Sequence, residues 1–211
     1  MEEQLAAFIL KKNNFLHSSV RDMELLLAKS SPQTFRKKER VYSVLDPVRY
    51  VYVIEKGTVE LFNYTSGKLQ KKTFSVLNKG NIFGYGELAE PQHVLYAVAE
   101  TACTIRKITQ QDFLDIISAN ANLVRDFFLS MAHQISQHQK AMLLDNARGK
   151  VLNYLGWMCE EFGVRDGKTM TIPRRLTNEQ IGNLLFLTRE TVVRTFQNLE
   201  SEGILTMDAR A

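Results

Sequence analysis

The run from Leu176 to Leu205 constrains the fold of this chain more than any other segment. Its apolar residues recur at spacings of three and four, which is helical periodicity: Ile181, Leu184, Leu185, Val192, Phe196 and Leu199. Thr177 followed by Gln180 has the form of a capping box, which starts a helix by satisfying free backbone N–H groups. Thr188 stands just before the second periodic stretch. Two short helices joined by a few residues are what a helix-turn-helix requires.

The polar residues of the second helix indicate what such a hairpin binds. Its apolar stripe must face the first helix, which leaves a polar set on or near the outer face: Arg189, Glu190, Val193, Arg194 and Gln197. In a major groove, arginine reads guanine and a carboxylate accepts from cytosine. We add Thr188, Arg174 and Arg175 to this DNA-binding set, with the two arginines as candidates for phosphate contact. The same pattern also fits a solvated amphipathic hairpin.

The segments LTNEQIG, TRETVVR and LESEGIL resemble the DNA-binding signature of the Crp/Fnr superfamily of bacterial transcription regulators. The Arg189-Glu190-x-x-x-Arg194 spacing is similar to the cyclic-AMP receptor protein branch, in which that Arg, Glu and Arg contact bases. This resemblance implies a homodimer that binds double-stranded DNA, with RNA polymerase as a further partner and a half-site of the TGTGA type. It also implies a winged-type domain, but family members continue into a β-hairpin wing after Ile204, where this sequence ends at TMDARA, so we expect a truncated or partly ordered C-terminus without wing–phosphate contacts.

Composition agrees with a globular regulator and excludes several other classes. Of the 211 residues, 45% are hydrophobic, which is enough for a full core. No apolar run approaches the roughly 20 residues needed to cross a bilayer, and acids precede the first short apolar run, so we expect a cytoplasmic protein without membrane contact. Two cysteines, Cys103 and Cys159, are too few for the four ligands of a [4Fe–4S] switch. The net charge of +4 is not concentrated in the DNA-binding segment.

Periodicity divides the rest of the chain into an α+β arrangement. Residues 1–31 predict two short helices, with Ser18 or Ser19 as the cap of the second. From about Thr34 to Ile108 the apolar period changes to two, in segments rich in Val, Tyr, Phe, Ile and Thr and separated by turn signals. Several short strands predict a sandwich or barrel, and their order resembles the jelly-roll, cyclic-nucleotide-binding-like domain of the same superfamily. We expect a sensor domain at 1–119, a dimerisation helix and hinge at 120–147, and the DNA-binding domain at 148–211.

A long helix is predicted after Asn120 because no Pro or Gly occurs before about Ala147. Within it, one stripe is spaced alternately by four and three residues: Val124, Phe128, Met131, Ile135, His138 and Met142. That spacing is a heptad seam of the kind that pairs helices. A second stripe, Leu123, Phe127 and Leu143, indicates that another side packs on the barrel. In the family this position holds the dimerisation helix, so the resemblance implies a parallel homodimer.

The effector site departs from the cyclic-AMP pattern. The resemblance places the pocket at Gly86, Glu87 and Leu88, and puts His93 and Val94 where that branch has an Arg-Ser pair for the cyclic phosphate. A buried phosphate needs a fixed cation, whereas histidine is charged only below about pH 6.5. We interpret Glu87 as part of a structural turn, and we expect cyclic AMP not to be the effector. His138 completes the list of pocket candidates.

The identity of the effector is open: a small organic acid, a peptide-like molecule, or none. An effector-independent or redox-tuned regulator is one alternative, and a regulatory subunit that acts on a protein partner is another. A cupin-type enzyme needs a histidine and carboxylate cluster for its metal. Of His17, His93, His133 and His138, only His93 falls in the predicted barrel. We therefore predict no catalytic residue, no metal site and no cofactor.

Overall fold

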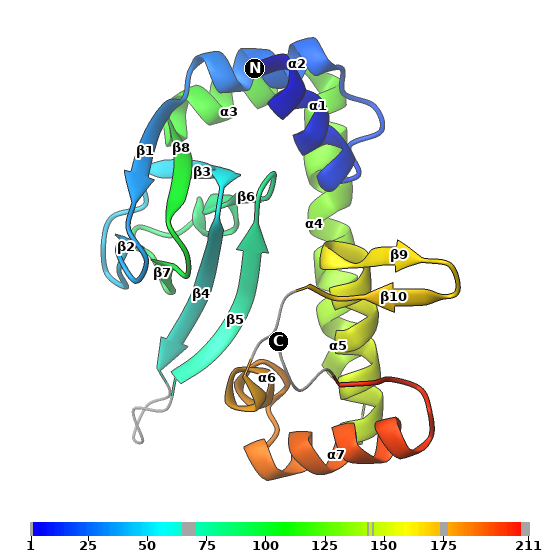
Figure 1. The fold of residues 1–211 in the computed structure, drawn as a ribbon. Coiled ribbons are helices and arrows are strands. Elements are labelled where there is room, and N and C mark those ends of the chain that lie inside the picture. The colour runs from blue at the N-terminus through cyan, green and yellow to red at the C-terminus, as the bar shows by residue number, and fades with distance from the viewer. Residues whose placement is uncertain (1, 65–70, 143, 145, 174–176, 208–211) are drawn as a thin grey trace. The chain divides into compact units, whose positions relative to one another are not determined.

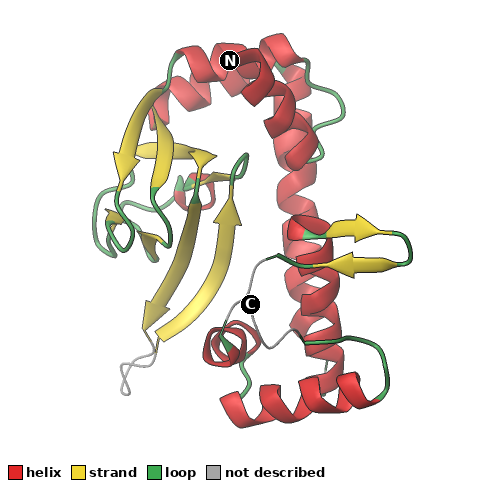
Figure 2. Ribbon diagram, viewed as in Figure 1, coloured by secondary structure: helices red, strands yellow, loops and turns green. Residues whose placement is uncertain are grey.

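Two compact units, Met1–Gln134 and Ile135–Ala211, make up the chain in the computed structural model. The structure describes residues 2–64, 71–142, 144, 146–173 and 177–207, without the side chains of 137, 138, 140–142 and 161. Helices precede and follow a strand-rich region, so the expected α+β class is confirmed (Figure 2). The expected domain boundaries, after residues 119 and 147, flank helix α4 (Ala121–Met142), and the division into units falls inside this helix.

The predicted jelly-roll is present as two four-stranded antiparallel sheets. The first sheet has the strand order β1 (Ser31–Phe35), β8 (Cys103–Thr109), β3 (Tyr50–Lys56), β6 (Ile82–Phe83). The second has the order β2 (Arg40–Tyr42), β7 (Tyr96–Ala99), β4 (Thr58–Tyr64), β5 (Lys71–Asn78) (Figure 1). Side chains from both sheets share one core, which includes Phe35, Tyr52, Ile54, Val59, Leu61, Phe83, Ala97 and Ile105. The sheets therefore form a sandwich around a filled interior.

The segment FRKKERVYSV contributes to two strands in different sheets. Phe35 ends β1 opposite Cys103, and Arg40 begins β2 opposite Val98. Between them Lys38 has a positive φ of 70°, which turns the chain from one sheet to the other. Strand alternation in sequence does not reveal such a crossing, because both strands keep the same period of two.

Helices α1 (Glu2–Lys12), α2 (Val20–Ala28) and α3 (Gln110–Ser118) share a second core with the first sheet and with α4 (Figure 1). Of the two serines expected as candidates for the cap of α2, Ser18 and Ser19, it is Ser19 that caps the helix, through a capping box with Asp22. Leu123 and Phe127 of α4 are buried in this core, which confirms the packing of these two members of the second stripe on the barrel unit, and Leu143 lies outside the described residues.

Buried Asp126 of α4 fixes the loop between α1 and α2. Its carboxylate accepts hydrogen bonds from the backbone N–H and Nδ1 of His17, at 3.0 and 2.7 Å. It also accepts from the backbone N–H and the hydroxyl of Ser18, both at 2.7 Å. Burial acts to raise the pKa of Asp126, but these hydrogen bonds outweigh it and hold that pKa below its ordinary value.

The second unit differs from expectation at its helix ends. α4 ends at Met142 and not near Ala147, and α5 (Ala147–Phe162) begins where the side chain of Asn146 accepts from the backbone N–H of Gly149 at 2.6 Å. A hairpin of β9 (Val164–Asp166) and β10 (Thr169–Thr171) follows, turning at Gly167. Helices α6 (Asn178–Leu185) and α7 (Arg189–Ser201) complete the unit. The described residues after Ser201, through Met207, contain no strand.

Candidate nucleic-acid interface and effector pocket

The helix-turn-helix is built from the caps that the sequence predicts. Thr177 and Gln180 form a capping box at the start of α6, with bonds of 2.8 and 3.1 Å between side chain and backbone. Thr188 caps α7 by accepting from the backbone N–H of Thr191 at 3.2 Å. Val192, Phe196 and Leu199 are buried, together with Ile181 of α6. The two helices thus pack through the stripes expected of them.

Close packing at the turn depends on Gly182. A Cβ atom added there would lie 2.8 Å from the carbonyl oxygen of Leu187, closer than van der Waals contact allows. The same Gly182 carbonyl accepts the backbone N–H of Leu187 at 2.8 Å. Glycine at this position therefore lets α6 approach the turn that leads into α7.

The opposite face of α7 presents the predicted base-reading groups. Arg189, Glu190, Arg194 and Gln197 are exposed, and Val193 is half-buried. Within the described part of the chain, none of the three charged side chains takes part in an ion pair. Their spacing of one and four residues places them together on the first two turns of α7. Arg174 and Arg175, the other two members of the expected set, lie outside the described residues.

The effector position is closed by an internal pair. Glu87 ends a short 3-10 helix (Tyr85–Glu87), and one of its carboxylate oxygens lies 2.5 Å from Nδ1 of His93. The other accepts the backbone N–H groups of Val94 and Leu95 at 2.9 and 3.2 Å. His93 is 1% exposed and its ring stacks on Tyr42, with centroids 3.7 Å apart. Burial, with the nearby Glu87 charge, raises the pKa of Tyr42 above its ordinary value.

The remaining pocket candidates are dispersed. Gly86 is an exposed turn residue, Leu88 packs against the helical core, and the side chain of Val94 is exposed. The side chain of His138 is outside the described set. The structure therefore brings Glu87 and His93 together as hydrogen-bond partners of each other, and Val94 borders a surface hollow together with His93.

Sequence reasoning missed two partners of this region. Tyr42 stacks on His93, and Tyr85 accepts a hydrogen bond from the side chain of Gln134 in α4 at 2.5 Å. Neither has a sequence signal beyond ordinary strand or turn composition, because each contact joins segments that are distant along the chain.

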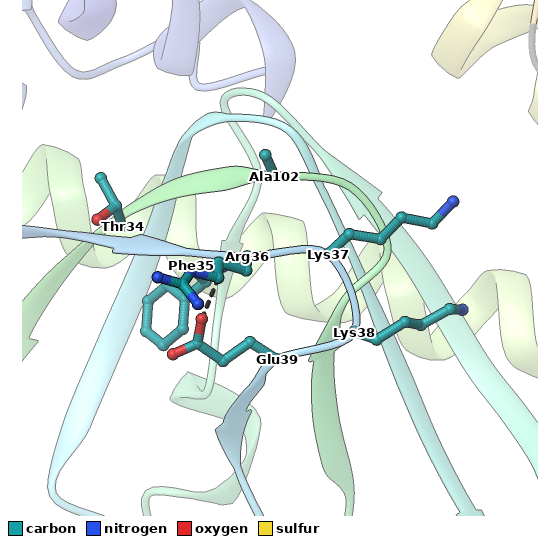
Figure 3. A pocket seen from close by; sticks show the side chains of 7 residues that line it. All are labelled: Thr34, Phe35, Arg36, Lys37, Lys38, Glu39 and Ala102. Carbon is teal, nitrogen blue, oxygen red and sulfur yellow. Dashed lines mark hydrogen bonds between the residues drawn. The ribbon is translucent and has the colours of Figure 1, made fainter.

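Two surface hollows occur on the sensor unit. One of about 310 Å³ borders His93 and Val94 and is lined by the loops at 44–45 and 90–94 with Asn63. The other, of about 750 Å³, lies at the loop between β1 and β2, beside Ala102. Figure 3 shows Lys37 and Lys38 extending to one side of this loop, with Arg36 beside Phe35 and Glu39.

The predicted dimer seam is exposed along α4. Val124, Phe128, Met131 and Ile135 are all exposed apolar residues, with Phe128 68% exposed. His138 and Met142, the last two seam positions, have no described side chains. An apolar stripe of this length on one helix is the geometry of a surface that pairs with another helix.

Three features of the described residues bear on metal binding, thiol chemistry and membrane insertion. The described residues include no group of three or more His, Cys, Asp or Glu side chains placed to hold a metal ion. Cys103 is buried and donates to the carbonyl of Thr58 at 3.1 Å. No helix within the described residues has the length and apolar character to span a bilayer.

Comparisons with known proteins identify both halves of the chain. Residues 32–120 match the cyclic nucleotide-binding domain family, and residues 149–211 match the Crp-like helix-turn-helix domain family. The anaerobic regulatory protein of Pasteurella multocida is 24% identical over 180 residues, covering 83% of this chain and 65% of that protein. The fumarate and nitrate reduction regulatory protein of Vibrio cholerae is 22% identical, covering 92% of this chain and 77% of that one. The structure of FixK2 from Bradyrhizobium japonicum matches with a TM-score of 0.70 at 24% identity, over 85% of this chain and 89% of the other.

Proposed function

Because this chain belongs to the Crp/Fnr superfamily of bacterial transcription regulators, we propose that it acts as a homodimer whose two recognition helices bind an inverted repeat in duplex DNA. The observation that carries the proposal is the exposed Arg189, Glu190 and Arg194 set on α7. With its opposite stripe buried against α6, this helix offers only that polar face to a groove.

The chemistry of the three side chains defines a half-site. Arg189 and Arg194 each donate two hydrogen bonds to a guanine, and Glu190 accepts from a cytosine amino group. These roles correspond to a half-site of the TGTGA type. A two-fold axis along paired α4 helices separates the half-site centres by one turn of DNA, about 34 Å.

The exposed seam of α4 supports the homodimer. In a single copy of the chain, α4 leaves four apolar side chains in water: Val124, Phe128, Met131 and Ile135. Pairing with the same stripe of a second copy removes them from water. Dimerisation also explains why an inverted repeat is the expected site. Transcription regulation by such a dimer takes place in the cytoplasm, with RNA polymerase as its partner.

Regulation by cyclic AMP does not fit this chain. The carboxylate and imidazole that face the effector position, Glu87 and His93, are bonded to each other in a buried arrangement. A cyclic phosphate entering there meets His93 and Val94 in place of the Arg-Ser pair of the cyclic-AMP branch, and it displaces a satisfied pair. A different signal at the barrel, or regulation without an effector, agrees with this arrangement.

The test is the DNA preference of the purified full chain. A duplex selected by the wild type from a random pool is expected to contain an inverted repeat. Arg189→Ala is expected to cost about 1–3 kcal/mol in binding to it, measured by fluorescence anisotropy, and to relax preference at one position. Arg165→Ala, an exposed arginine on β9, serves as the matched control. Equal losses for both variants, or a wild type that binds every duplex alike, contradict the proposed roles, and absence of DNA binding favours a protein partner.

A further inference from the structure

Two uncharged side chains, Val193 and Gln197, share the outer face of α7 with the three charged base-reading residues. At about 100° per residue around an α-helix, both lie within about 60° of Glu190. Gln197 is exposed and Val193 is half-buried, whereas Val192 and Leu199, on the other side of the helix, are fully buried. The face that α7 offers to a groove therefore includes an amide and an apolar group besides its charges.

The amide of Gln197 is available for hydrogen bonding outside the unit. Other polar side chains of α7 are satisfied within the helix: Thr195 donates to the carbonyl of Thr191 at 2.7 Å, and Ser201 donates to the carbonyl of Asn198 at 2.8 Å. Among the residues that the structure describes, none forms a hydrogen bond with the amide of Gln197. Its N–H donors and its carbonyl acceptor can therefore all bind a ligand.

The chemistry of the three charged residues covers only G·C base pairs. Arginine donates to guanine O6 and N7, and a carboxylate accepts from the amino group of cytosine. Glutamine is one of the two side chains that bind adenine through both N6 and N7, and apolar side chains contact the 5-methyl group of thymine. Val193 and Gln197 thus supply the A·T-reading chemistry that the charged residues lack.

The spacing of the two residues suits base contact. They are four residues apart on α7, which puts their Cβ atoms about 6 Å from each other on one side of the helix. From Glu190 to Gln197 the helix rises about 10 Å, the length of about three stacked base pairs. In homeodomains the base-contacting residues of the recognition helix follow the first one at intervals of three, four and seven. The same three intervals, counted from Glu190, end at Gln197.

We propose that Val193 and Gln197 read A·T base pairs beside the G·C pairs read by the charged residues. The amide of Gln197 donates to N7 and accepts from the N6 amino group of an adenine, and the methyl groups of Val193 contact the 5-methyl group of a thymine. This inference rests on the proposed DNA-binding function and deepens it, because it gives the half-site a requirement for A·T pairs at fixed positions.

The experiment removes single groups from the DNA. Deoxyuridine in place of thymine removes only the 5-methyl group, and 7-deazaadenine in place of adenine removes only the N7 acceptor. Each A·T pair in the half-sites of the duplex selected by the wild type is replaced in turn, and binding of the full chain is measured by fluorescence anisotropy. One deoxyuridine position is expected to weaken binding about fourfold, the value of one buried methyl group. One 7-deazaadenine position is expected to weaken it about fivefold, the value of one hydrogen bond.

Protein variants assign each effect to a side chain. Val193→Ala is expected to lose the response to deoxyuridine and to keep the response to 7-deazaadenine, and Gln197→Ala is expected to show the reverse. Asn198→Ala removes the neighbouring exposed amide, about 100° further around α7, and is the matched control that responds to both analogues as the wild type does. Each response compares one protein on two duplexes, so a change in the stability of a variant does not imitate the loss of a contact.

The outcomes separate this inference from the function on which it rests. The inference is overturned if both variants respond to the two analogues as the wild type does, or if the selected half-site has no fixed A·T pair. A Gln197→Ala protein that binds all duplexes more weakly by one factor also overturns it, because that is the pattern of a phosphate contact. A wild type that binds every duplex alike defeats the proposed function instead.

Discussion

The imidazole of His93 and the carboxylate of Glu87 lie 2.5 Å apart inside the sensor unit, where both side chains are buried. The Glu87 carboxylate thus hydrogen-bonds to three consecutive residues: to the ring of His93 and to the backbone N–H groups of Val94 and Leu95. The glutamate of the Gly86-Glu87-Leu88 turn therefore accepts hydrogen bonds from within the sensor unit.

Removing this acceptor is expected to destabilise the sensor unit. Glu87→Ala leaves two buried backbone donors and an imidazole without their partner, at a cost of about 2–4 kcal/mol in the free energy of unfolding. Glu87→Gln keeps an oxygen for the backbone donors and is expected to cost less. Urea denaturation followed by circular dichroism in the β-sheet region measures both. Equal stability of Glu87→Ala and wild type would show that the pair is dispensable.

Cyclic AMP is expected not to bind. Its phosphate is charged at neutral pH, and the only imidazole at the expected phosphate position already faces a carboxylate. Calorimetric titration at pH 7.5 should show no heat of binding up to about a hundred micromolar, well above the micromolar range of a functional site. Repeating the titration at pH 6 should not rescue binding, because Glu87 offsets any charge on His93. A micromolar dissociation constant at either pH would refute the closed pocket.

The seam on α4 is expected to form the dimer. Phe128→Asp or Ile135→Asp places a charge at each two-fold contact, which costs several kcal/mol per buried ion. Sedimentation velocity should then show a monomer at concentrations where the wild type is dimeric. Leu129→Asp, one residue away from the seam and also exposed, is the matched control and should remain dimeric. A dimer that survives both seam variants would place the interface elsewhere.

Gly182→Ala is expected to loosen the helix-turn-helix. The new methyl group meets the carbonyl oxygen of Leu187 at 2.8 Å, and overpacking of this kind costs about 1–3 kcal/mol. The control is Gly156→Ala in α5, where an added Cβ meets nothing within 4 Å. That change is expected to stabilise its helix by up to about 1 kcal/mol, since alanine is the better helix former. Thermal melting compares the stability of the two variants, and DNA affinity is measured for both. If Gly182→Ala is as stable as Gly156→Ala, the close approach of residue 182 to the carbonyl oxygen of Leu187 is contradicted.

Asp126 is expected to make the stability of the sensor unit depend on pH. Its pKa is lower in the folded chain, so its stabilising contribution is present above the ordinary value of about 3.9 and is lost as pH falls through the folded value. Asp126→Asn should therefore cost about 2 kcal/mol at pH 7 and progressively less below pH 4. Glu3→Gln, an exposed carboxylate of α1, is the control. If denaturation experiments give the same pH dependence of the free energy of unfolding for wild type and Asp126→Asn, the contribution of Asp126 to that pH dependence is ruled out.

Local sequence rules determined the helices α6 and α7 of this protein and the exposed polar face of α7. Capping chemistry at Thr177 and Thr188 and the spacing of Val192, Phe196 and Leu199 depend on neighbours within one or two turns, so they predict α6 and α7 correctly. The same reasoning identifies the buried and exposed stripes of α4 through residues such as Phe127 and Phe128.

Only the tertiary structure decided how distant segments meet. The His93 ring on Tyr42, the Asp126 anchor for His17 and the crossing between sheets at Lys38 each join residues whose separation along the chain hides the contact. The left-handed conformation of Phe186 is equally invisible in composition, because a phenylalanine in sequence gives no sign of positive φ. Burial and hydrogen bonding at a site are set by packing between elements, and sequence periodicity reports only which face of each element is apolar.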